Sequence, residues 1–127
     1  MSYTNFDRVV KENMLAFEKY YNLDETSKAA ALYSSECLVT VNGGIENGGP
    51  FTGKTTADVA TFLNALRNEM GATNMRFTIT SAANGEHTDT WTCDSGTGSC
   101  KATWEEQSDG QWKITRDEIT FVPKTTT

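Results

Sequence analysis

Apolar side chains recur along this chain with two different periods, helical in the first half and strand-like in the second. The first period predicts an amphipathic helix over residues 5–22, with Thr4 as a plausible N-cap. Its apolar face comprises Phe6, Val9, Val10, Met14, Phe17, Tyr20 and Tyr21. Asp24 can cap a short second helix over 25–34, whose buried side would be Ala29, Ala30, Leu32 and Tyr33. A third helix is expected from Thr55 or Thr56 until Gly71 ends it.

The second period is an alternation of apolar and polar residues, which predicts strands. One strand is expected early, over 37–41, followed by a glycine-rich loop over 42–50. Four more follow from residue 74 onward, separated by turns at 84–85, 95–98 and 108–110. Helices gathered on one side of an antiparallel sheet make an α+β fold. We therefore expect one domain over 1–127, with a curved antiparallel sheet wrapped around the long first helix.

The last strand changes its apolar phase. Trp112, Ile114 and Arg116 fall on one face, whereas Ile119 and Phe121 carry the apolar pattern afterwards. A shift of one residue sends side chains to the opposite face of a sheet. We expect a β-bulge near 116–118, which would also bend the sheet.

One sheet face is expected to hold the chemistry. With a four-residue turn at 95–98, Cys93 lies opposite Cys100, and one face combines apolar and ionisable residues. These are Trp91, Trp104, Trp112, Ile114, His87, Asp89, Arg116 and Glu118; the opposite face is rich in threonine. A two-residue turn at 84–85 would put Phe77 and Ile79 on the threonine face, and a three-residue loop would put them with Trp91.

Asp89 or His87 on this face is a candidate general base, and Arg116 could orient a substrate or stabilise an anion. The alternative is a structural ion pair between Asp89 and Arg116. The tryptophans and tyrosines could line a pocket for a flat apolar molecule, or they could simply fill the core.

Composition narrows the functional classes. A net charge of −6 without a basic cluster argues against nucleic acid and anionic membranes. No apolar run approaches the ~20 residues that span a bilayer, and the first residues do not resemble a signal peptide, so we expect a cytoplasmic protein. Three cysteines and one histidine match no zinc-site spacing. We expect reduced thiols, no metal and no cofactor.

Four stretches together resemble a known family. They are the long first helix with its short Asp-capped successor, the strand ECLVTVNGG, the step GPFTGKTTADVATFL and the end GQWKITRDEITFV. The chain resembles the SnoaL-like and ketosteroid-isomerase-like proteins, which share the curved-sheet cone of nuclear transport factor 2. The resemblance implies a conical pocket, a homodimer and functions that range from isomerases and epoxide hydrolases to non-catalytic modules.

The resemblance carries over the family's catalytic residues only in part. Family isomerases place an Asp at the end of the first strand, where this chain has Val41 and Asn42. Their oxyanion hole combines a first-helix tyrosine, for which Tyr20 or Tyr21 could serve, with a late-strand acid that is absent near Thr103. The pair Arg116-Asp117 resembles the Arg and Asp on the last strand of epoxide hydrolases with this fold.

These observations favour binding, and conversion by cofactor-free acid–base chemistry, of a small apolar molecule in the cone. Catalytic candidates are Asp89, Arg116 and His87; ligand contacts are predicted at Tyr20, Tyr21, Asn42, Trp91, Trp104 and Glu118. The alternative function is a non-catalytic dimerisation or protein-binding module. We expect a homodimer formed through the threonine-rich face.

Overall fold

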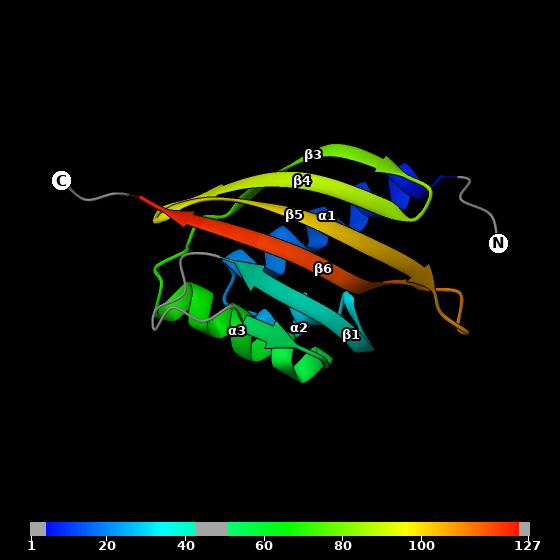
Figure 1. The fold of residues 1–127 in the computed structure, drawn as a ribbon, viewed down its shortest axis with the longest axis horizontal. Coiled ribbons are helices and arrows are strands. Elements are labelled where there is room, and N and C mark those ends of the chain that lie inside the picture. The colour runs from blue at the N-terminus through cyan, green and yellow to red at the C-terminus, as the bar shows by residue number, and fades with distance from the viewer. Residues whose placement is uncertain (1–4, 43–50, 125–127) are drawn as a thin grey trace.

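The computed structural model describes residues 5–42 and 51–124, and its architecture is α+β as expected (Figure 1). The predicted Thr4 cap and most of the predicted 42–50 loop lie outside these residues. The helices of the described part are α1 (Phe6–Asn22), α2 (Thr26–Ala30) and α3 (Thr56–Asn68). Its strands are β1 (Tyr33–Asn42), β2 (Phe51–Gly53), β3 (Arg76–Ala83), β4 (Glu86–Cys93), β5 (Gly96–Glu106) and β6 (Trp112–Pro123).

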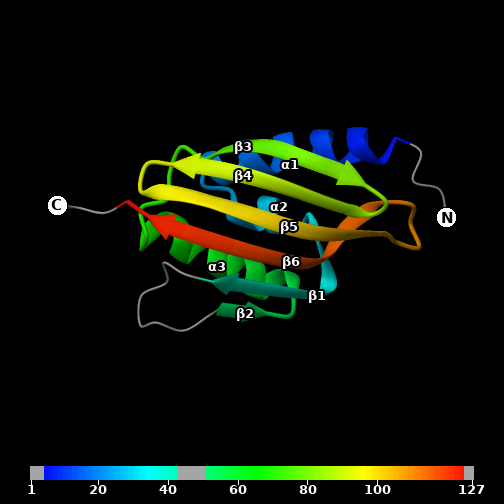
Figure 2. The ribbon, with the colours of Figure 1, turned by 45° about the horizontal axis from the view of Figure 1, so that its top comes forward.

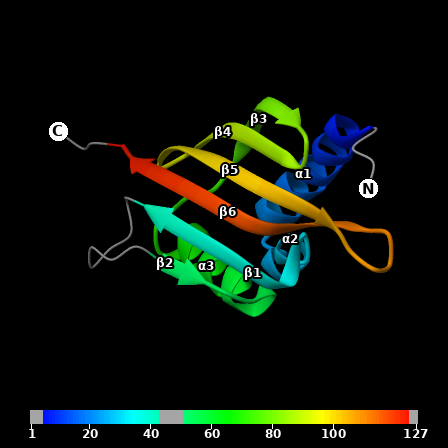
Figure 3. The same ribbon diagram turned by 45° about the vertical axis from the view of Figure 1, so that its right-hand side comes forward.

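The six strands form one sheet in the order β2-β1-β6-β5-β4-β3. All neighbours are antiparallel except β1 and β6, which pair in parallel and so join the first strand to the last. The sheet curves, and the three helices lie on its concave side (Figures 2 and 3). The interior of the protein is therefore the space between this inner face and the helices.

Helix α1 buries the apolar stripe that its spacing predicts, with Phe6, Val10, Met14, Phe17 and Tyr21 against the sheet. Two polar side chains near its end tie it to the edge strand β3. The Asn22 side chain bonds both backbone groups of Met75, and Glu18 accepts the backbone N–H of Phe77 at 2.8 Å. These bonds use backbone groups that an edge strand would otherwise leave unpaired.

The first strand begins earlier than its sequence suggests. Residues expected to continue the second helix belong to β1, which starts at Tyr33 beside Ile114 of β6. The backbone N–H of Ile114 also bonds the carbonyl oxygen of Leu32 at 3.0 Å. Pairing with a distant strand thus overrides the local helical pattern, and it carries Tyr33 into the core.

The turn between β4 and β5 is shorter than predicted. Cys93 lies opposite Gly96, and Asp89 lies opposite Cys100, so the predicted facing of Cys93 and Cys100 is wrong. The cysteines are free. Gly96 and Gly98 belong to strand β5 instead of the turn. Gly98 lies opposite Trp91, whose ring occupies the space where any Cβ at Gly98 would stand.

The β3–β4 hairpin resolves the two alternatives for Phe77. Asn84 and Gly85 form a two-residue turn with φ angles of 54° and 84°, as a type I′ hairpin requires. A bulge between Ile79 and Ser81 then resets the phase, so that Phe77 lies opposite Trp91. The shorter turn and the inner position of Phe77 therefore coexist.

The phase switch in β6 occurs slightly earlier than expected. Trp104 pairs with Ile114 and Thr103 pairs with Arg116, so Thr115 is the extra residue of the bulge. Arg116 and Glu118 consequently face solvent on the outer side, whereas Asp117 points into the core. The prediction that Arg116 and Glu118 share the inner face with Trp91 is wrong.

Candidate functional site

A small cavity lies between the inner face of the sheet and helices α1 and α3. Its volume is about 20 Å³, enough for about one water molecule. Apolar and aromatic side chains form most of its wall, interrupted by five polar groups: Tyr33, His87, Asp89, Cys100 and Asp117. Among the residues that line it, none is Lys or Arg, so nothing in the wall carries a permanent positive charge.

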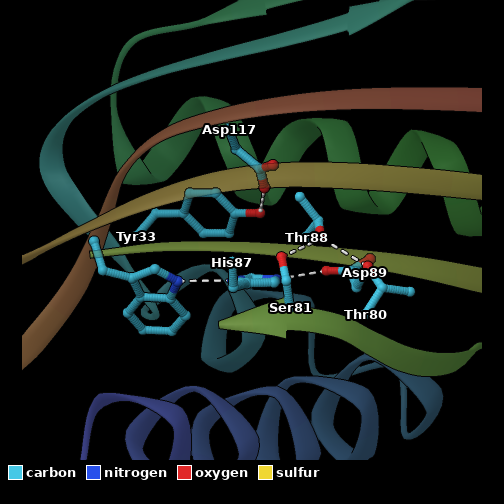
Figure 4. A network of polar contacts seen from close by, with 8 residues as sticks. Tyr33, Thr80, Ser81, His87, Thr88, Asp89 and Asp117 are labelled. Carbon is cyan, nitrogen blue, oxygen red and sulfur yellow. Dashed lines mark hydrogen bonds and ion pairs between the residues drawn. The ribbon is translucent and has the colours of Figure 1, made fainter. Parts of the chain in front are cut away.

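Two consecutive hydrogen bonds hold Asp89 in this wall. Oδ2 of Asp89 lies 2.6 Å from Nε2 of His87, and Nδ1 of His87 lies 2.8 Å from the indole nitrogen of Trp104. All three side chains are buried. Alternation along β4 places His87 and Asp89 on the same face (Figure 4). Strand β5 supplies Trp104.

The tryptophan determines where the histidine carries its proton. An indole N–H only donates hydrogen bonds, so Nδ1 of His87 must accept and cannot hold a proton. His87 is therefore the neutral tautomer with its proton on Nε2, which donates to Asp89. This arrangement orients the Asp89 carboxylate and makes His87 a positioning residue.

A second pair faces the same cavity from the other side. The Tyr33 hydroxyl at the start of β1 donates to Oδ2 of Asp117 in β6, with an O–O distance of 2.5 Å (Figure 4). Burial raises the pKa of Asp117 to about 8; the bond from Tyr33 opposes this rise, and the charge of Asp89 adds to it. Asp117 therefore holds a proton at neutral pH, and because Oδ2 accepts from Tyr33, that proton belongs on Oδ1.

Each of these carboxyl groups keeps one oxygen free. Oδ1 of Asp89 and Oδ1 of Asp117 are buried, and neither has a partner within hydrogen-bond distance among the described residues. The Cys100 thiol, which lies opposite Asp89 in the sheet, interacts with the Asp89 carboxyl only as a weak donor. Buried polar atoms are normally satisfied, so an unpaired one calls for an explanation. Here the two atoms belong to residues that line one cavity. Oδ1 of Asp89 is a hydrogen-bond acceptor, and Oδ1 of Asp117, which holds the proton, is a donor.

The Cys100 thiol is a poor nucleophile in this setting. Burial, followed by the charges of Asp117 and Asp89, raises its pKa well above the ordinary value. It therefore remains a thiol, and thiolate is the reactive form. Burial likewise raises the pKa of Tyr33 well above its usual range, with Asp117 adding to the effect, so Tyr33 stays a hydrogen-bond donor.

The structure brings some of the predicted site residues together and separates others. Asp89, His87 and Trp91 line the cavity, and Trp104 supports it through His87. Arg116 and Glu118 lie instead on the outer face, beside a surface pocket with Lys101. Neither side chain lines the cavity in the cone.

Three further predicted ligand contacts lie away from the cavity. Asn42 is exposed at the end of β1. Tyr20 is half-buried beneath the amines of Lys19 and Lys28, and the Tyr21 hydroxyl is used in a bond to the carbonyl oxygen of Ala72. None of these three residues lines the cavity.

Sequence reasoning missed the pair Tyr33 and Asp117. The signal for Asp117 was present in the pattern, since it alternates with Ile119 and Phe121, which carry the inward phase. Tyr33 gave no such signal, because it followed a helical stretch. Only its pairing with β6 reveals its role.

No protein-family model matches the sequence, and no curated protein matches it significantly. Solved structures do. A ketosteroid isomerase-like protein from Erwinia carotovora atroseptica superposes with a TM-score of 0.70 at 9% identity over 94% of this chain and 98% of that one. An NTF-2 like protein from Shewanella oneidensis superposes with a TM-score of 0.67 at 15% sequence identity, over 90% of this chain and 98% of that one. This chain has the nuclear transport factor 2-like cone fold.

The cone fold also includes ActVI-ORFA from Streptomyces coelicolor, with a TM-score of 0.62 at 12% identity over 90% of this chain and 95% of that one. At such identities the likeness concerns the fold alone. Within 5–42 and 51–124, no helix is long and apolar enough to cross a membrane, and no group of three metal-ligating side chains forms a metal site. The cytoplasmic location stays a prediction.

Proposed function

We propose that this protein binds a small neutral carbonyl compound in the cone and moves a proton within it. Asp89 is the base and Asp117 is the acid. The observation that carries the proposal is the pair of unpaired, buried carboxyl oxygens on one apolar cavity, of which the Asp117 oxygen holds a proton. Paired carboxyl groups with different protonation states suit acid–base catalysis.

In this reaction the bond between the α-carbon and its hydrogen breaks, and the proton moves to Oδ1 of Asp89. The electron pair left behind forms the enolate, whose oxygen accepts a hydrogen bond from Oδ1 of Asp117. Asp89 then returns the proton to the same carbon or to a conjugated one, which gives exchange or isomerisation. His87, held by Trp104, keeps Asp89 oriented throughout.

The electrostatics of the wall favour a neutral substrate. Asp89 and Asp117 are the acidic groups there, and the lining contains no cation to offset a carboxylate or phosphate ligand. Bringing a second anion into this apolar space would cost desolvation as well as repulsion. A carbonyl oxygen, in contrast, accepts the free proton of Asp117 and adds no charge.

A proton-exchange assay tests the proposal. The α-protons of 2-butanone are followed by NMR in deuterated buffer at neutral pH, with and without protein. We expect the wild-type protein to accelerate exchange, and Asp89→Asn and Asp117→Val to remove the acceleration. Arg116→Met is the matched control, because Arg116 adjoins Asp117 but faces solvent. Exchange at the buffer rate with wild-type protein, or an equal loss in Arg116→Met, would refute the proposal.

A second candidate function is a dimerisation or protein-binding module. The small size of the cavity favours it, since about 20 Å³ admits no organic ligand unless the wall moves. The outer face offers a surface of the required kind, where Thr88 bonds the hydroxyls of Thr80 and Ser81 (Figure 4). Dimer formation without any exchange activity would favour this alternative.

A further inference from the structure

A surface groove runs between helix α1 and the edge strand β3. Its volume is about 330 Å³, and its lining consists of Lys11, Met14, Leu15, Glu18, Phe77 and Ile79. Leu15 is 62% exposed there, one of three large apolar side chains of the described residues that are exposed. The groove is therefore wide, apolar and open to solvent.

The groove and the inner cavity share two residues of their walls. Met14 and Phe77 line both spaces and separate them. Phe77 is only half-buried and meets Phe17 edge to face, with ring centroids 5.5 Å apart. Methionine has a flexible side chain that adapts readily to new neighbours. Rotation of these two side chains would join the groove to the cavity.

The backbone beside this partition is held by hydrogen bonds from helix α1. Glu18 holds the backbone N–H of Phe77, and Asn22 holds Met75 just before it. Helix α1 and strand β3 are therefore tied together at this point. The groove has a stable floor and a partition made of two movable side chains.

We infer that the substrate is a neutral carbonyl compound with an extended apolar chain, which lies in this groove while its carbonyl head occupies the cavity. The inference rests on the proposed function. It explains why a cavity of about 20 Å³, too small for a whole organic ligand, lies beside a groove whose volume is more than ten times larger. The rim carries one cation, Lys11, and one anion, Glu18, so the groove does not select a charged chain.

The test compares a short and a long methyl ketone, 2-butanone and 2-decanone, by isothermal titration calorimetry. Each methylene that leaves water strengthens binding by about fourfold when fully buried. Because the groove is open on one side, we expect the long ketone to bind the wild-type protein at least about tenfold more tightly. We expect Leu15→Asp to weaken the long ketone by about fivefold or more and to leave the short one unchanged.

Leu23→Asp is the matched control. Leu23 is also a leucine of the α1 region with similar exposure, 59% against 62% for Leu15, but it lies outside the groove lining. It should leave the affinity for both ketones unchanged, and circular dichroism verifies that both variants fold. Equal affinities of the two ketones, or equal effects of Leu15→Asp and Leu23→Asp, would overturn the inference.

The two proposals fail in different ways. If the protein accelerates exchange of 2-butanone but binds both ketones equally, the groove assignment is wrong and the acid–base assignment stands. If neither ketone binds and neither exchanges, the proposed function is wrong, and the groove assignment is overturned with it.

Discussion

Replacing Asp117 by Asn should make this protein less sensitive to pH. Asparagine has nearly the same shape as a protonated aspartic acid, can accept the Tyr33 hydrogen bond and cannot ionise. The wild-type side chain is buried and has a pKa of about 8, against 3.8 for the ordinary group. The variant therefore removes one titration and changes little of the packing.

The sign of the effect follows from proton binding. Between pH 4 and pH 8 the folded wild-type protein holds a proton on Asp117 that the unfolded chain has released. Stability from this group is therefore greatest at low pH and falls as the pH rises towards the folded-state pKa. For one proton, the free energy of unfolding falls by about 1.4 kcal/mol for each pH unit in this range. Between pH 5 and pH 8 the wild-type protein should therefore lose about 4 kcal/mol of stability from this group.

Urea denaturation followed by tryptophan fluorescence at pH 5, 6, 7 and 8 measures this difference. The free energy of unfolding of Asp117→Asn, relative to wild type, should rise steadily over this range. Glu105→Gln, which removes an exposed carboxylate of the same sheet, should run parallel to wild type. A relative change below ~1 kcal/mol would mean that Asp117 is already ionised at neutral pH, and the acid assignment would fail.

Four other outcomes are expected. Gly98→Ala should destabilise the fold strongly in thermal melts, because its Cβ would overlap the Trp91 ring; an unchanged melting temperature would contradict the packing. Trp104→Phe should cost about 1–3 kcal/mol in urea denaturation by leaving Nδ1 of His87 unpaired, and a neutral result would disprove the link. Arg116→Met should cost under ~1 kcal/mol in the same assay, and a larger loss would show a buried role. Light scattering should give twice the 14.0 kDa chain mass, and a monomer would remove the dimer prediction.

Local patterns were sufficient to predict most of the fold. The stripe of α1 and the alternation in β4 each specify a buried face without help from distant residues. They placed Asp89, His87 and Trp91 together correctly. The family resemblance supplied the cone shape, which the superpositions confirm at the level of fold.

The errors on the inner face of the sheet concern register. A turn of two residues instead of four moved Cys100 from Cys93 to Asp89, and a bulge at Thr115 exchanged the faces of Arg116 and Asp117. The alternation of residues does not reveal the length of the turn, which here leaves Gly98 within the strand beneath the Trp91 ring. A shift of one residue in register moves every side chain of a strand to the opposite face. For this reason Arg116 was expected on the inner face, where Asp117 lies instead.

The parallel pairing of β1 with β6 has a consequence for biosynthesis. Tyr33 and Asp117 are 84 positions apart, and their contact exists only when the last strand lies against the first. A nascent chain can fold its α1 helix early, but it cannot assemble the acidic half of the site until β6 has left the ribosome. Until then, β1 exposes an unpaired edge on the side where β6 will lie, and this edge is open to pairing with other chains. The same strand that brings Asp117 to Tyr33 also covers this edge of β1.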